Sequence, residues 1–329
     1  MRKRLYILII AIMALLASSF GAAAAQGAPG AQAEGVGHKA LTTTQAVVLG
    51  VIEGFTEYLP VSSTGHLLLA EQVMGIGKNQ YQTRSQQEQT KEAADAYTIC
   101  IQAGAILAVL WLYFGRIKQI LKGLAGRDEK GRRLLINVVV GFLPAAVLGL
   151  LFNKVVKSYL FGPWPVVAAW LVGGVAILAV SCHKPAGAEE RRPGMQLDEM
   201  TWRMALIIGF GQCLAMWPGV SRSLATIVGS LLVGLGMEAA VEYTFLLGVV
   251  TLGAATAYDT VKHGQVMLQT FDHFALIVGV GVAFIAAVIS VKWMVGYLTR
   301  HGLEMFGYYR VGIAVITTIF LLTTQMIWI

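Results

Sequence analysis

The sequence predicts an all-α polytopic membrane protein with an inverted-topology repeat, in which each half is a re-entrant helical hairpin followed by three transmembrane helices. Composition is the first evidence: of 329 residues, 56% are hydrophobic and 13% are charged, with a mean hydropathy of +0.66. Soluble domains carry about 25% charged residues. The other two observations are six apolar runs of bilayer length and a motif that occurs once in each half of the chain.

The formal net charge is +7, and the basic residues are spread over the segments between the apolar runs. This distribution indicates membrane topology and contact with anionic lipid rather than a nucleic-acid-binding patch. We therefore expect membrane lipids as partners and no nucleic acid.

Residues 1–25 combine a basic start, an apolar run and three alanines before Gln26. This order is typical of a secretory signal peptide, and an uncleaved N-terminal membrane helix is the alternative. In both cases the basic end stays in the cytoplasm. Residues 26–43, rich in Gly and Ala, then form an extracellular linker.

Six full spans are expected from apolar runs of about 20 residues, the length that a bilayer requires. They lie near 94–114, 134–152, 164–182, 241–258, 273–295 and 309–328. The loop 115–133 is strongly basic, which places it in the cytoplasm by the positive-inside rule. Alternation then assigns the other loops, with 153–163 and 259–272 outside and 183–202 and 296–308 inside.

Two further apolar stretches, 44–76 and 203–236, are interrupted at their middle by Pro, Gly and polar residues. Each is long enough for two half-helices that enter and leave the membrane on one side, an arrangement tolerated where the irregular backbone is buried in protein or lines a wet cavity. The predicted topology brings the first hairpin in from outside and the second from the cytoplasm. The chain then divides into repeats 44–182 and 203–329, joined by a cytoplasmic linker at 183–202.

The two hairpins share a pattern at constant spacing. Gly50, Glu53, Val61 and Ser62 of the first match Gly209, Gln212, Val220 and Ser221 of the second. Inverted repeats with broken helices that meet near the bilayer midplane are characteristic of transporters. We expect the two hairpin tips to meet, bringing acids and a His from one half to an Arg from the other.

Glu53 and Glu57 lie four residues apart, so a helix places both carboxylates on one face. Two close carboxylates repel each other unless they share a cation or a proton, which predicts a divalent metal site or a retained proton. The alternative is a buried acid paired with an Arg for a structural purpose.

Ser62, Ser63 and Thr64 follow Pro60, where the backbone is expected to turn. At the start of a half-helix such a hydroxyl can be a simple N-cap. The same position directs backbone N–H groups and the helix dipole toward an anion, which predicts a phosphate site. His66 lies about one helical turn beyond Ser63, and a Ser next to a base is the minimal activated nucleophile.

The second tip supplies a permanent cation, Arg222, whose fork of N–H groups matches phosphate oxygens. Gly219 lets the backbone approach a ligand closely. An ion pair between Arg222 and Glu53 or Glu57 is the alternative, and both roles are compatible if the pair opens to admit substrate. Other hydroxyls of this tip can donate to further oxygens, namely those of Ser221, Ser223 and Thr226.

Residues 53–66 read Glu-Gly-Phe-Thr-Glu-Tyr-Leu-Pro-Val-Ser-Ser-Thr-Gly-His, and residues 218–226 read Pro-Gly-Val-Ser-Arg-Ser-Leu-Ala-Thr. Together they resemble the undecaprenyl-diphosphate phosphatase family of the bacitracin-resistance type. The resemblance extends from about residue 41 to the C-terminus and includes 102–108 and 306–310. It departs at Leu224, where the family usually has Gly.

The resemblance implies an enzyme, a membrane hydrolase that removes the terminal phosphate of undecaprenyl diphosphate. The product, undecaprenyl phosphate, is the lipid carrier of peptidoglycan synthesis, and its recycling confers bacitracin resistance. A multi-pass protein of the bacterial cell membrane is implied, with a site that the predicted topology opens to the outer, periplasmic face. A homodimer and a second, flippase-like role are left open.

By position in the motifs, the resemblance implies Ser63 as the nucleophile, with His66 and Glu57 as acid/base or metal-associated groups. The family leaves open whether Ser63 or His66 attacks. Glu53 and Glu57 would hold a divalent cation, with Mg²⁺ expected ahead of Mn²⁺ or Ca²⁺. Arg222 would clamp the diphosphate, and the expected substrate-binding residues are Ser62, Thr64, Gly219, Ser221, Ser223 and Thr226.

Two other classes of function compete with the enzyme. A transporter of the lipid phosphate is favoured by the repeat and requires a site equally open to both faces. A structural scaffold requires that the polar residues of the tips can be replaced without loss of activity. The cluster of Ser, His, Glu and Arg favours the enzyme, because a channel needs no nucleophile.

Overall fold

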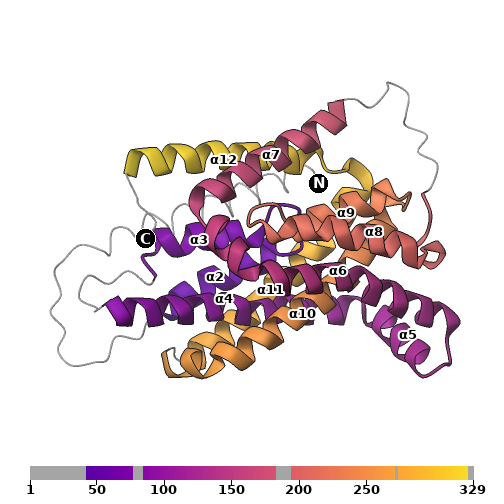
Figure 1. Cartoon of the computed structure of the whole chain (residues 1–329), viewed down its shortest axis with the longest axis horizontal. Coiled ribbons are helices and arrows are strands. Elements are labelled where there is room, and N and C mark those ends of the chain that lie inside the picture. The colour runs from indigo at the N-terminus through magenta and orange to yellow at the C-terminus, as the bar shows by residue number, and fades with distance from the viewer. Residues whose placement is uncertain (1–41, 77–83, 183–193, 271–272, 325–329) are drawn as a thin grey trace.

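The computed structural model describes residues 42–76, 84–182, 194–270 and 273–324, and the elements named in these ranges are all helical (Figure 1). The first half contributes α2 (Thr43–Thr56), α3 (Ser63–Val73), α4 (Arg84–Leu112), α5 (Phe114–Leu124), α6 (Glu129–Tyr159) and α7 (Pro163–Cys182). The second half contributes the 3-10 turns η1 (Leu197–Glu199) and η2 (Cys213–Met216), with the helices α8 (Trp202–Gln212), α9 (Arg222–Leu232), α10 (Met237–Thr270), α11 (His273–His301) and α12 (Glu304–Thr324). The all-α prediction is confirmed. Residues 1–25, expected as a signal peptide or a membrane helix, lie outside the described residues, as does most of the linker expected at 26–43.

In the described part of the chain, five helices are long and apolar enough to cross a membrane. They cover Glu129–Phe152, Pro163–Ser181, Met237–Lys262, His273–His301 and Glu304–Thr323. A sixth span results if Tyr97–Leu112 and α5 are taken together, although the two segments are bent by 80°. Outward apolar side chains such as Leu150 and Ile277 agree with a surface that faces lipid. The protein is therefore a polytopic membrane protein.

Four segments expected as loops are largely helical. Helix α6 continues to Tyr159, through most of the loop expected at 153–163. The loop expected at 115–133 contains α5, because Ile117 and Ile120 pack against buried residues at the start of α6. Helix α10 continues to Thr270, through most of the loop expected at 259–272, and α11 continues to His301. Hydropathy marks the apolar part of a helix, and these helices continue into the polar residues beyond it.

The two interrupted stretches each form a pair of short helices, α2 with α3 and α8 with α9. Helix α2 has 14 residues and the others have 11, fewer than the roughly 20 that cross a bilayer. Both pairs begin at a Thr N-cap, Thr42 and Thr201, whose side chain accepts a hydrogen bond from the third helical residue. In Figure 1 the pairs approach from opposite ends of the long axis and their breaks meet near the middle. The inverted orientation of the two halves stays a prediction.

Glycines let the first helix of each pair pack closely on a helix of the other half. A Cβ atom at Gly50 of α2 would lie 2.6 Å from the carbonyl oxygen of Gly279 of α11. One at Gly209 of α8 would lie 2.5 Å from the carbonyl oxygen of Gly141 of α6. Small residues of this kind are common where membrane helices meet. Gly50 and Gly209 occupy matching positions of the sequence repeat. Each packs on a helix of the other half, Gly50 of the first half on α11 and Gly209 of the second half on α6.

Candidate active site

The breaks between the paired helices form tip 1 (residues 57–62) and tip 2 (residues 217–221), which share an unusual backbone. Among the described non-glycine residues, a positive φ occurs at Ser62 (72°) and Ser221 (75°) alone. Each is the N-cap of the helix that follows. Such a conformation costs roughly 1–3 kcal/mol and persists where the surroundings force it, often at functional sites. The two serines are also matching positions of the repeat.

Side chains from outside tip 1 hold four of its consecutive carbonyl groups. Leu59 accepts from Ser223 at 2.8 Å, Pro60 from Arg310 at 3.3 Å and Val61 from the Trp170 indole at 2.8 Å, and Ser62 lies 2.7 Å from Nδ1 of His66. A buried carbonyl without a partner is costly, so this set of contacts strongly favours one backbone path. It explains why the left-handed conformation of Ser62 is tolerated.

A cavity of about 240 Å³ lies between the two tips. Its polar lining combines Ser63 and Thr64 at the start of α3 with Ser221 and Arg222 at the start of α9. The structure thus brings the two tips together, as expected from the repeat. The other lining residues are Glu57, Ser62, Gln102, Ala145, Gln212, Ala215, Met216, Pro218, Gly219, Thr251 and Leu252.

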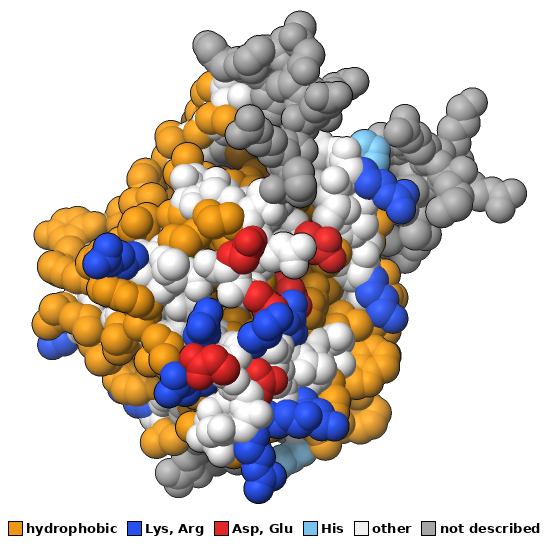
Figure 2. Space-filling model, turned by 90° about the vertical axis from the view of Figure 1, so that its right-hand side faces the viewer, with side chains coloured by type: hydrophobic (Ala, Val, Ile, Leu, Met, Phe, Trp, Pro, Cys, Tyr) orange, Lys and Arg blue, Asp and Glu red, His pale blue; other side chains and the backbone are white. Residues whose placement is uncertain are grey.

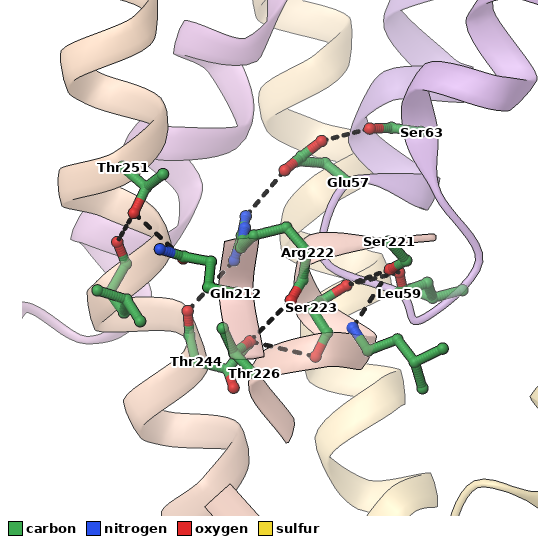
Figure 3. Close-up of polar contacts among 12 residues, drawn as sticks. Glu57, Leu59, Ser63, Gln212, Ser221, Arg222, Ser223, Thr226, Thr244 and Thr251 are labelled. Carbon is green, nitrogen blue, oxygen red and sulfur yellow. Dashed lines mark hydrogen bonds and ion pairs between the residues drawn. The ribbon is translucent and has the colours of Figure 1, made fainter. Parts of the chain in front are cut away.

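Glu57 connects the two tips (Figure 3). One carboxylate oxygen accepts a hydrogen bond from the Ser63 hydroxyl, and the other accepts from Nη2 of Arg222 at 2.8 Å. Both the carboxylate and the guanidinium are largely buried, with side chains 6% and 10% exposed. A charge-assisted hydrogen bond of this kind is about twice as strong as a neutral one. The Glu57 carboxylate is therefore a proton acceptor in hydrogen-bond contact with the Ser63 hydroxyl.

Arg222 is held on several sides. Its Nη1 donates to the Thr244 carbonyl at 3.2 Å, and its Cζ lies 5.4 Å from the centre of the Tyr58 ring. Its Nε is buried and has no hydrogen-bond partner among the described residues. The guanidinium therefore lines the cavity with donor capacity still available for an anion.

Glu53 is fully buried, and neither carboxylate oxygen has a hydrogen-bond partner in the described structure. It lies within electrostatic range of Glu57 and Arg222. A buried carboxylate without a partner requires a proton or a cation. The described residues hold no group of three His, Cys, Asp or Glu suited to a metal. Two carboxylates nevertheless fit Mg²⁺, which usually binds through one or two carboxylates together with waters and substrate phosphates.

His66 does not contact Ser63 in the way expected from their spacing. Its Nδ1 lies 2.7 Å from the Ser62 carbonyl oxygen and its Nε2 lies 2.7 Å from the Tyr309 hydroxyl. Its ring also stacks on Tyr309 and meets the edge of Trp170. Both ring nitrogens are occupied, and the acceptor on the Ser63 hydroxyl is Glu57 instead. His66 thus supports the backbone next to Ser63.

The predicted binding hydroxyls of the two halves divide into two groups. Those of Ser62, Thr64 and Ser221 line the cavity, whereas Ser223 and Thr226 are fully buried outside its lining. The Ser223 hydroxyl donates to the Leu59 carbonyl of tip 1, and the Thr226 hydroxyl donates to the Arg222 carbonyl at 2.9 Å within α9. These two hydroxyls therefore stabilise the tips in this structure, and their role in binding substrate stays a prediction.

Sequence reasoning assigned no role to Tyr309 and Arg310 of α12 or to Gln212 of α8. Tyr309 holds His66, and Arg310 donates to carbonyl groups of both tips. Gln212 lines the cavity with a buried Nε2 that has no partner among the described residues. An ionisable residue inside an apolar helix signals a functional position, and Arg310 carried that signal.

The fold and the cavity define an integral membrane protein with a partly polar cavity between two pairs of short helices. Residues 46–316 match the family described as Bacitracin resistance protein BacA, and the chain belongs to this family. The undecaprenyl-diphosphatase of Sorangium cellulosum is 43% identical over 269 residues, which cover 82% of this chain and 83% of that protein. The undecaprenyl-diphosphatase of Nitrosomonas europaea is 41% identical over 276 residues, 84% of this chain and 93% of the relative. The undecaprenyl-diphosphatase of Rhodopseudomonas palustris BisB18 is 43% identical over 268 residues, which cover 81% of this chain and 92% of that protein.

Proposed function

We propose that this protein hydrolyses undecaprenyl diphosphate to undecaprenyl phosphate and inorganic phosphate. It thereby recycles the lipid carrier of peptidoglycan synthesis and confers resistance to bacitracin. Family membership and the names of the relatives support the activity. The observation that carries the chemistry is the Ser63–Glu57–Arg222 chain of hydrogen bonds at the wall of the cavity.

In the proposed reaction the Ser63 oxygen attacks the terminal phosphorus while Glu57 takes the hydroxyl proton. The bond from that phosphorus to the bridging oxygen breaks, and undecaprenyl phosphate leaves. Water then attacks the phosphoserine, inorganic phosphate is released, and the proton held by Glu57 returns to the serine oxygen. Phosphoryl transfer depends mainly on positioning and on neutralising the phosphate oxygens, which is the role of Arg222.

Glu53 and Glu57 are the residues that would hold a divalent cation, with Mg²⁺ as the first candidate. When bound, the cation would neutralise charge on the phosphate oxygens. The buried, unpartnered oxygens of Glu53 support this assignment, because the carboxylate needs a positive partner. The apolar lining residues, among them Met216 and Leu252, suit the isoprenoid chain near the diphosphate. We place the protein in the bacterial cell membrane, with the site open to the outer face.

A transporter of polyprenyl phosphate is the second candidate. The paired left-handed serines, Ser62 and Ser221, and the matching glycines support two structurally related halves. Transport requires that the cavity open in turn to each face of the membrane, and that substrate cross without turnover. The enzyme ranks first because the acceptor on the Ser63 hydroxyl serves bond cleavage and has no function in transport.

The direct test is phosphate release from undecaprenyl diphosphate by protein purified in detergent, with Mg²⁺ or with EDTA. We expect release that depends on the metal and that falls about a thousandfold or more in Ser63→Ala and about a hundredfold or more in Arg222→Ala. Ser158→Ala is the matched control, because the Ser158 hydroxyl donates to the Lys154 carbonyl in its own helix, outside the cavity lining. Absence of release by folded wild-type protein would move transport to first place.

A further inference from the structure

We infer that Arg310 of α12 is a positioning residue that fixes the distance between Ser63, which follows tip 1, and Arg222, which follows tip 2. The inference rests on the hydrolysis proposed above. It concerns a residue outside both motifs that suggested the activity, and it assigns a part in the reaction to α12.

Arg310 is fully buried and donates to four backbone carbonyl groups. Its Nη1 bonds to Pro60 at 3.3 Å and Val220 at 3.1 Å, and its Nη2 bonds to Gly219 at 2.9 Å and Ala169 at 2.8 Å. One guanidinium therefore contacts tip 1, tip 2 and α7 together. The planar fork of N–H donors makes this arrangement available to Arg and not to Lys.

No carboxylate forms an ion pair with Arg310 in the part of the chain that the structure describes, where the buried pair between the tips is Arg222 with Glu57. Burying a cation is costly unless its N–H groups are satisfied, and here carbonyl oxygens supply the compensation at Nη1 and Nη2, whereas the buried Nε has no partner among the described residues. A neutral side chain of similar volume would avoid that cost. The buried charge of Arg310 therefore lies where tip 1 and tip 2, two irregular backbone segments, must be held in a fixed relative position.

Two of the carbonyl groups bound by Arg310 lie shortly before the residues proposed to act on the substrate. Pro60 lies three residues before Ser63, and Val220 lies two residues before Arg222. The neighbouring Gly219 has φ of 100°, and a Cβ there would lie 2.7 Å from the Val166 carbonyl oxygen, so tip 2 is pressed against α7. A shift of about 1 Å between catalytic groups costs about a hundredfold in rate, so a looser junction should be visible in catalysis.

The test compares Arg310→Lys with wild type in phosphate release and in hydrogen exchange of the peptides that cover the two tips. We expect kcat to fall at least tenfold with KM changed less than threefold, because Arg222 still binds the diphosphate while Ser63 is displaced from it. Exchange at both tips should become faster. Arg116→Lys is the matched control: Arg116 also makes several bonds, to Glu242, Gln119 and Asp198, outside the cavity lining, and kcat should not change.

A wild-type kcat per folded molecule in Arg310→Lys would overturn the inference. If that variant does not fold, Arg310→Gln replaces it, since the amide keeps two N–H donors without the charge; failure of both to fold would show a purely structural role and also overturn the inference. If wild-type protein releases no phosphate, the proposed function fails, and the exchange data still decide whether Arg310 holds the two tips.

Discussion

Glu57 is the residue through which the two tips act on each other. It accepts from Ser63 at the start of α3 and from Arg222 at the start of α9. In the proposed reaction, a phosphate that enters the cavity would compete for the donors of Arg222 and leave Glu57 free to take the Ser63 proton. Substrate binding and activation of the nucleophile would then be linked at one carboxylate.

Replacing Glu57 with Gln should lower kcat by about 10²–10⁴-fold, the usual contribution of a general base. The amide can still accept from Ser63 but cannot take its proton. KM should not rise, because Arg222 loses an ionic partner and becomes more available to the diphosphate. Steady-state phosphate release over a range of substrate concentrations measures both constants. A wild-type kcat in this variant would reassign the base, with His66 as the next candidate.

Sequence patterns identified the chemical groups of the site but not their pairing. Glu57, Ser63 and Arg222 were all expected, and the alternative of an ion pair between Arg222 and a tip Glu is present. The expected pairing of Ser63 with His66 is replaced by that with Glu57. The partner of His66, Tyr309, lies 243 residues further along the chain, and spacing within one motif contains no information on such a contact.

At the scale of elements, the helix breaks were predictable and the helix ends were not. Pro60, Gly219 and the polar residues around them interrupt apolar runs, and α2–α3 and α8–α9 are separated there. Helices α5 and α10 extend into segments expected as loops, because hydropathy does not detect amphipathic or polar helical turns. Figure 2 shows the end of the molecule near α5, where Lys and Arg side chains alternate with Asp and Glu.

Ion pairs join η1 to two helices at this charged end. Asp198 bonds to Lys130 of α6 at 2.9 Å and to Arg116 of α5 at 3.4 Å. The hydrogen bond from Lys130, with the charges of Lys130 and Arg116, holds the pKa of Asp198 below its usual range. A carboxyl group with a lowered pKa stabilises the fold at pH values above its pKa in the unfolded chain, and that stabilisation is lost as pH falls through its folded-state pKa.

Asp198→Asn should therefore lower the thermal stability at neutral pH by a small amount, about 0.5 kcal/mol, since the pair is partly exposed. The difference from wild type should shrink as pH falls below about 4, near the ordinary pKa of Asp. Thermal unfolding in detergent at several pH values measures it, and in a Lys130→Ala background the effect should be smaller. A difference that stays constant through the acid range would contradict this account.

At the scale of the whole molecule, the site is assembled from both halves of the chain. Helix α2 packs on α11 and α8 packs on α6, so each hairpin rests on a helix of the other half. The polytopic all-α fold followed from hydropathy, and the meeting of the tips followed from the repeated motif. The packing of each hairpin on a helix of the other half did not follow from the sequence, and neither did the contacts of α12 with both tips. Both depend on tertiary geometry that a linear pattern does not encode.

The most direct test of the central claim is to detect the covalent intermediate. Protein mixed with undecaprenyl diphosphate labelled on its terminal phosphate is quenched with SDS at neutral pH within the first turnover, which preserves both phosphoserine and phosphohistidine, and the labelled peptide is mapped by mass spectrometry. The account predicts phosphate on Ser63, with no label in Ser63→Ala and an unlabelled Ser158. Label on His66, or full turnover by Ser63→Ala protein, would contradict it.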